Sequence, residues 1–290
     1  MKVLFSSDLH GEIHLYQQLL DLALASSSEI IAIGGDFLPS YPPSKRYEDM
    51  IPNQKIFIHQ FLLPFFDKLV QTTSVTSILT IPGNWDLGYG YLHEKPVGKI
   101  VDLDRKIIQL KNGYELIGYP FVPPTPFRPK EFEKMDDPES PWPPQKYPSY
   151  IKNPDHEGEI SPVDPYLFLR QRNTIRDDLD RLIRPLHFSK CTYMMHSPPF
   201  GTALDLIQGK KYTGCRAIKA FIEKCQPLLT LHGHIHEAPE ISGKYLDRIG
   251  KTLCINPGQF SLSGKDSQRL HAVTFEMEDI EKTLKHTCFE

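Results

Sequence analysis

The chain has 290 residues, of which 40% are hydrophobic and 24% are charged, with 33 basic and 36 acidic side chains. A chain of this length can bury a substantial core without disulfides or structural metals. The formal net charge of −3 gives no electrostatic reason to expect general binding to nucleic acid or to an anionic membrane.

The first residues and the cysteines bear on the compartment in which the protein works. No apolar run approaches the roughly 20 residues that span a bilayer, and Met1–Phe5 leads directly into a strand-like segment without a secretory pattern. The five cysteines are an odd number and form no C-x-x-C pair, which is typical of reduced intracellular thiols. We therefore expect a cytoplasmic protein.

The N-terminal part of the chain has the alternation of strands and helices that is typical of an α/β fold. Apolar runs of four or five residues predict strands, and apolar residues at helical spacing predict helices. The predicted elements are a strand at Lys2–Ser6, a helix at Ile13–Ala25, a strand at Glu29–Ile33, a helix at Asn53–Val70 interrupted near Pro64, and a strand at Ser77–Ile81.

The middle of the chain departs from this pattern. Residues 119–170 contain thirteen of the 26 prolines and one glycine, Gly158, and the run Pro120–Phe127 cannot lie inside a helix or a central strand. Its aromatic residues argue against disorder, because they can be buried. We predict a single domain over residues 1–290 with an irregular, packed insertion at 119–170, which either covers the functional face or is a plain surface loop.

Regular structure is predicted to return after the insertion. Short β-type segments separated by glycine or polar turns predict an antiparallel end to the sheet. The predicted elements are a helix at Arg172–Ile183, a strand at Cys191–Met195, a helix at Ala217–Lys224, a strand at Leu228–Leu231, and β-type segments at Lys251–Ile255, Leu270–Phe275 and Ile280–His286.

Side chains that can bind a divalent metal follow five of the predicted strands. Each signal is weak alone, since a Gly-Asp pair after a strand is more often a turn. Together they bring seven potential ligands to the same end of successive strands, where ligands bind in open α/β sheets. Oxygen and nitrogen donors of this kind suit Mn²⁺, Fe²⁺, Zn²⁺ or Mg²⁺. The seven residues are Asp8, His10, Asp36, Asn84, His196, His234 and His236.

These motifs resemble a known series. Asp8-Leu9-His10, Gly35-Asp36, Gly83-Asn84, His196 and Gly233-His234-Ile235-His236 look like the motifs of the calcineurin-like metallophosphoesterases, over a stretch from Lys2 to about Phe260. The resemblance implies a four-layer α/β/β/α sandwich, in which two mixed sheets lie face to face with helices outside. The segment from His196 to Asn256-Pro257-Gly258 is similar to a branch with prokaryotic phosphoesterases and brain-type metallophosphodiesterases.

The resemblance also implies a site for two divalent metal ions. Two ions about 3.5–4 Å apart can share a hydroxide and lower the pKa of water from about 15.7 toward 7. We therefore expect a phosphoester hydrolase that acts by attack of a metal-bridging hydroxide on a small phosphorylated substrate such as a nucleotide, with Asp36, Asn84 and His196 in catalytic roles. By position, one ion would be held by Asp8, His10 and His236, the other by Asn84, His196 and His234, and Asp36 would bridge both.

One position departs from the family pattern. The third motif usually reads Gly-Asn-His-Asp or Gly-Asn-His-Glu, but this chain has Trp85 in place of the histidine. The histidine normally contacts the phosphate and can protonate the leaving group, whereas an indole N–H cannot deliver a proton at neutral pH. Losing this help typically costs about 10²–10⁴-fold for a poor leaving group. This favours phosphodiesters or phosphoanhydrides with good leaving groups, and of these we expect phosphodiesters.

Several interpretations stay open at this stage. His14 or a residue of the insertion could supply the proton, and Trp85 could stack on a nucleobase or simply pack. Gly201 and Thr202 could donate hydrogen bonds to phosphate or form a plain turn, and His232 is expected to pack in its strand. The main alternative function is a regulatory protein that binds metal and nucleotide but turns over little. A nuclease is the weakest hypothesis, because no basic run is interleaved with aromatics.

Overall fold

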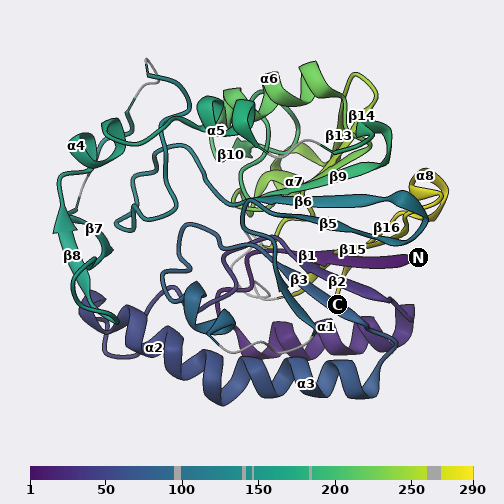
Figure 1. Cartoon of the computed structure of the whole chain (residues 1–290), viewed down its shortest axis with the longest axis horizontal. Helices are drawn as coiled ribbons and strands as arrows, with labels where there is room; N and C mark the ends of the chain where they lie inside the picture. Colours follow the sequence, from purple (N-terminus) through teal and green to yellow (C-terminus); the bar gives the residue numbers. More distant parts are fainter. Residues whose placement is uncertain (95–98, 139–141, 146, 183–184, 260–268, 290) are drawn as a thin grey trace.

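The computed structural model describes residues 1–94, 99–138, 142–145, 147–182, 185–259 and 269–289. Within these ranges, two six-stranded sheets lie face to face and helices cover both outer faces (Figure 1). This arrangement confirms the expected α/β/β/α sandwich of two mixed sheets.

The first sheet is mixed, with the order β16-β15-β1-β2-β3-β4. The four strands from β1 to β4 are parallel, and β15 and β16 complete the sheet in antiparallel pairing. Its strands are β1 (Lys2–Ser6), β2 (Ile30–Ile33), β3 (Ser77–Thr80), β4 (Ile100–Asp102), β15 (His271–Glu276) and β16 (Lys285–Cys288).

The second sheet has the order β13-β14-β12-β9-β6-β5. Its four inner strands are parallel, and the two edge strands β13 and β5 are antiparallel to their neighbours. The strands are β5 (Ile107–Gln109), β6 (Glu115–Tyr119), β9 (Cys191–Met195), β12 (Leu229–Leu231), β13 (Leu246–Ile249) and β14 (Thr252–Ile255). Two separate hairpins pair β7 (Ser149–Lys152) with β8 (Ile160–Val163), and β10 (Leu206–Ile207) with β11 (Lys211–Tyr212).

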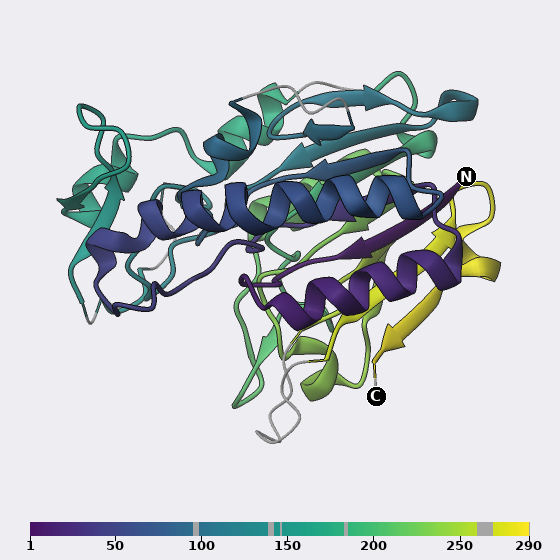
Figure 2. The ribbon, with the colours of Figure 1, turned by 90° about the horizontal axis from the view of Figure 1, so that it is seen from below.

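The helices cover the sheets from outside. Helices α1 and α3 lie along the first sheet, and α5 and α6 lie on the second (Figures 1 and 2). The helices are α1 (Ile13–Ser26), α2 (Met50–Phe57), α3 (Leu63–Thr72), α4 (Pro165–Arg170), α5 (Ile175–Arg181), α6 (Arg216–Cys225), α7 (Ala238–Ser242) and α8 (Ile280–Thr283).

Side-chain alternation along the strands explains why there are four layers. In β1, Val3 and Phe5 enter the core between the two sheets, whereas Leu4 packs with the residues of α1 and α3. In β9, Met194 points into the same central core, and Tyr193 packs against the helices of the second sheet. Successive side chains of a strand face opposite ways, so strands that are apolar throughout, as parallel strands are, need a cover on both faces.

The long helix between β2 and β3 runs without a break from Met50 to Thr72 (Figure 2). A π-helical segment, Ile58–Leu62, joins α2 to α3, and Pro64 lies in the first turn of α3. Proline has no N–H to continue an α-helical ladder, and the wider π turn accommodates that loss within the helix. The predicted irregularity near Pro64 is therefore present, but it takes the form of a π turn, and the helix begins three residues earlier than predicted.

Most other predicted elements lie within a few residues of their observed bounds, with one partial error at the C-terminus. The segment Ile280–His286 was predicted to be β-type, but its first part is the helical turn α8, and the strand β16 begins only at Lys285. The Thr283 amide donates to the Asp279 carbonyl at 3.2 Å, which closes this turn. The antiparallel ending holds for β13, β15 and β16, while β14 is parallel to β12 on its other side.

The insertion at residues 119–170 contains the hairpin β7–β8, helix α4 and extended irregular segments, and it lies at one end of the sandwich (Figure 1). Phe121, Val122, Met135 and Leu169 are buried, so side chains of its described part contribute to packed regions. Residues 139–141 and 146 of the insertion, the last predicted helical residue Ile183, and Phe260 lie outside the described residues.

Two further expectations concern membranes and cysteines. Among the helices that the structure describes, none has the length and apolar character needed to cross a bilayer. All five cysteines are free thiols: Cys191, Cys215 and Cys254 are buried, Cys225 is half-buried and Cys288 is exposed.

Candidate functional site

Six of the seven predicted metal ligands gather in two triads at the carboxyl ends of parallel strands. In each triad, the ligand atoms of the three side chains lie within 4.8 Å of one another. Both triads combine residues that follow strands of the first sheet with residues that follow β9 or β12 of the second. The first triad is Asp8, His10 and His236, and the second is Asp36, His196 and His234.

The first triad is held by direct contacts. His236 Nε2 lies 3.2 Å from Asp8 Oδ1 and also 3.2 Å from His10 Nε2. The other ring nitrogen of His10, Nδ1, contacts the Ser40 hydroxyl. A second partner on the far nitrogen fixes the ring orientation and leaves Nε2 facing the cluster, as is usual for metal-binding histidines.

The second triad has the same organisation. His196 Nδ1 donates to the Gly34 carbonyl at 2.7 Å, so His196 Nε2 faces Asp36 Oδ2 at 3.3 Å. The ring of His234 lies across from that of His196, with 5.2 Å between centroids. The His234 amide donates to both carboxylate oxygens of Asp8, at 3.1 and 3.0 Å, which joins the second triad to the first.

Four of these six residues have an unusual backbone conformation. Asp8, His10, Asp36 and His234 have φ values of 61°, 46°, 49° and 67°. Residues other than glycine rarely adopt the left-handed region, and each instance costs on the order of 1 kcal/mol or more. The surrounding loops hold the strain, and such strain concentrates at functional sites.

Two glycines allow the loops to approach this closely. A Cβ atom on Gly83 would lie 2.3 Å from Asp36 Oδ1, and one on Gly233 would lie 2.0 Å from Ser7 Oγ and 2.4 Å from Asp8 Oδ2. Any larger residue at either position would therefore displace a carboxylate of one of the triads.

The seventh predicted ligand, Asn84, provides a test of whether a cation fits. Asn84 is 1% exposed, and neither its Oδ1 nor its Nδ2 has a hydrogen-bond partner among the described residues. Its neighbour Trp85 donates its amide to Asp36 Oδ1 at 2.7 Å, so Asn84 lies beside the second triad. A buried amide oxygen without a partner is costly, and a metal ion bound to Asn84 Oδ1 would supply that partner. The donor set of carboxylates, imidazoles and an amide is suited to a divalent ion.

The histidines of the two triads differ in pKa. Burial disfavours the charged ring of His196, but Asp36 with Asp8 outweighs it and raises the pKa of His196 to about 9. Burial and the neighbouring His236 lower the pKa of His10 to about 4, and burial and His196 lower the pKa of His234 to about 3. His196 beside Asp36 has a raised pKa, as does His236 beside Asp8. A neutral imidazole is the form that binds metal, so a bound ion would displace the proton that the carboxylates favour on these two rings.

Two residues that sequence reasoning did not assign hold the loops in place. Asp86 accepts hydrogen bonds from the amides of Gly83 and Leu38, both at 2.9 Å, and so ties the loop after β3 to the loop after β2. Asn256 Nδ2 donates to the carbonyls of Gly233 and Ile235. Both lie in motifs noted above, Gly83-Asn84-Trp85-Asp86 and Asn256-Pro257-Gly258, but their loop-tying role depends on contacts that the motifs do not reveal.

With this geometry in hand, comparison with known proteins identifies the family. A family model for calcineurin-like phosphoesterases matches residues 1–238. The chain belongs to this family. The match confirms the resemblance seen in the motifs, and it makes the protein a metal-dependent phosphoester hydrolase whose family implies divalent metal ions in the site.

Solved structures share the fold of this phosphoesterase at low sequence identity. One crystal structure has a TM-score of 0.59 at 15% identity, covering 100% of this chain and 99% of the other. TT1561 of Thermus thermophilus has a TM-score of 0.54 at 13% identity, covering 99% and 98%. No curated protein sequence matches the chain.

The departure from the family pattern at position 85 lies beside the candidate metal ligands of this phosphoesterase. Trp85 is 6% exposed, and its ring packs against Tyr41 and Phe127, with centroids 5.2 and 5.6 Å away. It lines a cavity of about 530 Å³ together with His10 and His236. Trp85 therefore packs, as one interpretation expected, and also forms part of the wall of the site.

The other expected contact residues of the phosphoesterase are engaged elsewhere. The amides of Gly201 and Thr202 both donate to the Asp205 carboxylate, at 3.0 and 2.8 Å, and the Thr202 hydroxyl donates to the Pro199 carbonyl. Gly201 and Thr202 therefore form a plain turn, and neither of their amides is free to bind a phosphate. His14 is half-exposed on the first turn of α1, and its Nδ1 lies 3.9 Å from Glu12 Oε2.

His232 follows β12 and is bonded on both sides of its ring. Its Nδ1 lies 3.0 Å from the Met195 carbonyl and 2.9 Å from the Ser197 carbonyl, and its Nε2 lies 2.8 Å from the Thr230 hydroxyl. Burial lowers the pKa of His232 to about 4, so the ring is neutral at physiological pH. It packs, as expected, but it lies one residue beyond the end of the strand rather than within it.

Proposed function

We propose that this protein is a dinuclear metal-dependent phosphodiesterase that acts on small substrates. Asp8, His10 and His236 would hold one divalent ion, Asn84, His196 and His234 a second, and Asp36 both. The observation that carries the proposal is the meeting of the two triads, joined by the amide of His234 on Asp8. When bound, a pair of divalent ions supplies Lewis acidity toward phosphate oxygens and activates water at neutral pH.

The side chains of the site have distinct roles in this proposal. Asp36 supplies the negative charge that offsets the repulsion between two nearby cations. Ser40 and the Gly34 carbonyl act on the far ring nitrogens of His10 and His196 and so fix the orientation of both rings. The mixed oxygen and nitrogen donors suit manganese, iron, zinc or magnesium.

The chemistry available at position 85 favours substrates with good leaving groups. The indole of Trp85 cannot protonate a leaving alkoxide, so a substrate with a poor leaving group gains little from this wall of the site. Esters whose leaving group departs without a proton are less affected. Trp85, which departs from the family pattern, therefore supports phosphodiesters with good leaving groups as substrates.

An aromatic cavity beside the metal ligands supports an aromatic group on the substrate. Tyr41, Phe127 and Tyr147 are 61%, 45% and 57% exposed, and together with Trp85 they line a space of about 680 Å³ that adjoins the first cavity through Tyr41 and Trp85. The Arg128 guanidinium also lines it and stacks 4.3 Å from the Tyr47 ring centroid. Exposed aromatics gathered in one place indicate a binding surface, and nucleobases or aryl groups stack on such rings.

The proposal is tested by hydrolysis of bis(p-nitrophenyl) phosphate by the purified protein with added Mn²⁺, together with its metal content. We expect close to two bound ions and measurable turnover, and an Asp36→Asn variant that loses turnover while it remains folded. A wild-type rate in Asp36→Asn would contradict the shared role of this carboxylate. A Phe127→Ala variant should raise KM for nucleotide-like diesters and leave inhibition by inorganic phosphate, which has no aromatic group, unchanged if the aromatic cavity holds the base.

A second candidate function is a regulatory protein that binds metal and nucleotide with little turnover. The specific observation in its favour is again Trp85, which removes the usual proton donor and fills part of the wall. Tight nucleotide binding without hydrolysis of any activated ester, in protein loaded with two ions, would favour this alternative over the hydrolase.

A further inference from the structure

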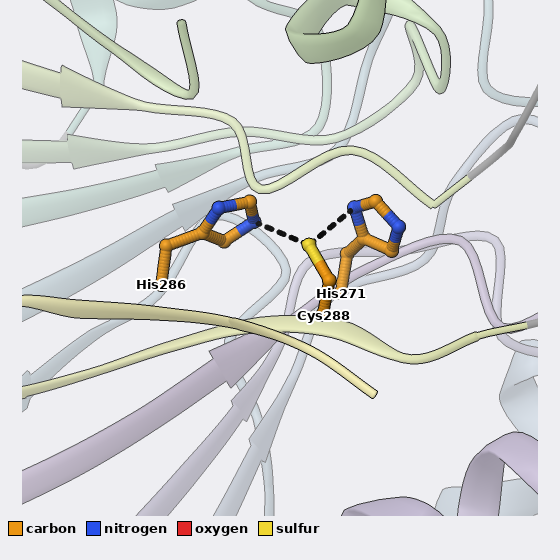
Figure 3. A group of neighbouring side chains, drawn as sticks. All are labelled: His271, His286 and Cys288. Atoms are coloured by element: carbon orange, nitrogen blue, oxygen red, sulfur yellow. Dashed lines mark hydrogen bonds between the residues drawn. The ribbon is translucent and has the colours of Figure 1, made fainter. Parts of the chain in front are cut away.

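Three side chains that can bind metal meet at the C-terminal strand pair, outside both triads of the active site. His271 on β15 pairs directly with Cys288 on β16, and His286 lies two residues before Cys288 on the same strand. Side chains two residues apart on a strand share a face, so all three lie on one face of the sheet. Figure 3 shows the two imidazole rings flanking the sulfur, each with a nitrogen directed at it.

The distances match those of a tetrahedral zinc site. Cys288 Sγ lies 3.5 Å from His271 Nδ1 and 3.8 Å from His286 Nε2. Zinc bonds of about 2.3 Å to sulfur and about 2.0–2.1 Å to nitrogen, at tetrahedral angles, place sulfur and nitrogen about 3.5 Å apart. All three ligand atoms lie within 4.8 Å of one another, so a zinc ion could contact each of them with small side-chain movements.

We propose that His271, His286 and Cys288 form a second, structural metal site that binds Zn²⁺. The sulfur ligand separates this site chemically from the two triads, which contain only oxygen and nitrogen donors. Thiolate and imidazole together select zinc over Mg²⁺, Ca²⁺ or Mn²⁺, which prefer oxygen. The proposal does not depend on the reaction of the active site.

A carbonyl oxygen lies at the same point and could complete the coordination. The Pro257 carbonyl is 3.2 Å from His271 Nδ1 and 3.0 Å from His286 Nε2. In the metal-free protein each ring nitrogen donates to this oxygen, and zinc would take over both nitrogens. The Pro257 carbonyl would then take the fourth position, which closes the site as a structural zinc site requires.

Burial keeps the imidazoles of His271 and His286 in the neutral form that binds metal. Burial, together with the neighbouring His271, lowers the pKa of His286 to about 4, and burial also lowers the pKa of His271. Both rings are therefore neutral at physiological pH, as zinc binding requires. Partial burial raises the pKa of the Cys288 thiol, which disfavours the thiolate in the metal-free protein. Only a metal that binds sulfur strongly, such as zinc, would therefore displace this proton.

The location indicates what the ion would do. Pro257 lies between Asn256, which bonds the loop of His234 and His236, and Gln259, whose amide donates to the His236 carbonyl at 3.2 Å. An ion at the new site would fasten the outer strand β16 to β15 and to this supporting loop. We infer a structural role, in which the ion stabilises the C-terminal strands and the loop that backs the active site.

The test uses cobalt as a spectroscopic probe of the full-length reduced protein. Co²⁺ bound to a thiolate gives a charge-transfer band in the near ultraviolet, whereas cobalt in the oxygen–nitrogen triads gives none. We expect the band to appear in the wild type and in Cys225→Ser, the matched control for a partly exposed cysteine elsewhere. We expect it to vanish in Cys288→Ser, with the remaining bound cobalt unchanged.

A second measurement guards against a folding effect of the substitution. Zinc-loaded wild type should hold one more ion per chain than His286→Gln or Cys288→Ser after removal of loosely bound metal. Both variants should melt at a lower temperature than the wild type only when zinc is present. A wild type without the charge-transfer band at excess cobalt, a band that persists in Cys288→Ser, or equal zinc content in all three proteins would each overturn the proposal.

Discussion

Single side chains control both the charge and the spacing of the active site. Asp8 and Asp36 each have a histidine nitrogen within 3.3 Å, and each belongs to a loop whose backbone is held in a left-handed turn. A small change in either loop would therefore move the carboxylate of Asp8 or Asp36 relative to its histidine, and so alter the spacing of the candidate metal ligands. The residues that set the spacing are accordingly as important as the ligands themselves.

Replacing Trp85 tests which job this side chain has. A Trp85→His variant introduces a group that can transfer protons near neutral pH, and general-acid help is typically worth about 10²–10⁴-fold for a poor leaving group. We expect the rate on a phosphomonoester such as glycerol phosphate to rise at least tenfold, with a smaller change on bis(p-nitrophenyl) phosphate. Steady-state kinetics on both substrates provides the measurement.

The matched control is Trp85→Phe, which removes a similar amount of the indole without adding a titratable group. A gain shared by both variants would mean that space, and not proton transfer, limits the monoester reaction. No gain in either would mean that Trp85 serves another purpose, such as stacking on the substrate through the cavity it shares with Phe127.

The close approach of Gly83 to Asp36 leads to a second prediction. In Gly83→Ala the new methyl group would meet Asp36 Oδ1 at 2.3 Å, so the carboxylate must move. We expect bound metal and activity to fall by about 10–100-fold, the range typical for disturbed support of a metal ligand. Metal analysis after dialysis and kinetics at fixed Mn²⁺ measure the effect.

Gly90→Ala is the control for the same chemical change. A Cβ on Gly90 meets no atom within 4 Å, and added helix propensity in its short helical turn is harmless. We expect Gly90→Ala to keep wild-type metal content. Equal metal loss in the two variants would show that the effect does not come from the contact with Asp36.

At the scale of elements, the insertion is organised around a buried ion pair. Lys130 and Glu133 are both 0% exposed, and Lys130 Nζ donates to Glu133 Oε2 at 3.0 Å and to the Thr125 carbonyl at 2.9 Å. The Thr125 amide and hydroxyl both donate to the Glu133 carboxylate. This proline-rich segment is thus held by a buried network of polar contacts. The network lies next to Phe127 and Arg128, which line the aromatic cavity.

Lys130→Met should destabilise the protein by more than the loss of one ion pair would, because it leaves Glu133 buried without its positive partner. Removal of one partner leaves a buried carboxylate, which typically costs about 3–5 kcal/mol. Burial already raises the pKa of Glu133 to about 7, and without the lysine it rises further. A raised pKa in the folded state means that protonation stabilises it, so the defect should grow as the pH rises through about 7 and shrink toward pH 5. Urea unfolding of the variant and the wild type at several pH values measures this.

The double variant Lys130→Met/Glu133→Leu provides the internal control. With both charges gone, no unpaired charge remains, and paired apolar replacements of buried ion pairs are often close to neutral. We expect the double variant to be more stable than Lys130→Met alone at pH 8. If the single variant is as stable as the wild type at pH 8, Glu133 is not a buried charge that needs this lysine.

The elements that the sequence could predict are those with strong periodicity. Strands such as Cys191–Met195 and helices such as Ile13–Ser26 are long and apolar on the buried side, so local pattern was sufficient. The three-residue strands Ile100–Asp102 and Ile107–Gln109 are half-exposed edge strands whose pairing depends on distant partners, and no local signal predicted them. The seven candidate ligands could be picked out of the sequence because each lies in the loop that follows a strand.

Other features of the site could not be predicted because they depend on contacts across the fold. The left-handed conformation of Asp8 or His234, for example, is imposed by neighbouring loops. The pairing of Lys130 with Glu133, and the meeting of His271 with Cys288, join residues whose local sequence has no distinctive pattern. The register between β15 and β16 brings His271, His286 and Cys288 together. This register depends on how the two strands pair, so neither strand's sequence reveals it alone.

At the scale of the whole molecule, the active site connects the two sheets. Asp8, His10 and Asp36 follow strands of the first sheet, whereas His196, His234 and His236 follow strands of the second. Each triad contains residues from both. An ion bound by either triad would therefore cross-link the two layers at the edge of the central core.

This arrangement predicts that metal binding stabilises the entire fold. An ion that binds only the folded chain adds about 4 kcal/mol to the free energy of unfolding when it is present at 1,000 times its Kd, so Mn²⁺ should raise the melting temperature by several degrees in a concentration-dependent way. Removal of metal with a chelator should reverse the gain. Calorimetry of the wild type and of Asp36→Asn with and without Mn²⁺ measures both effects. The variant should gain much less, because one carboxylate of the cross-link is lost. An equal melting temperature with and without metal in the wild type would show that the two sheets hold together independently of the site.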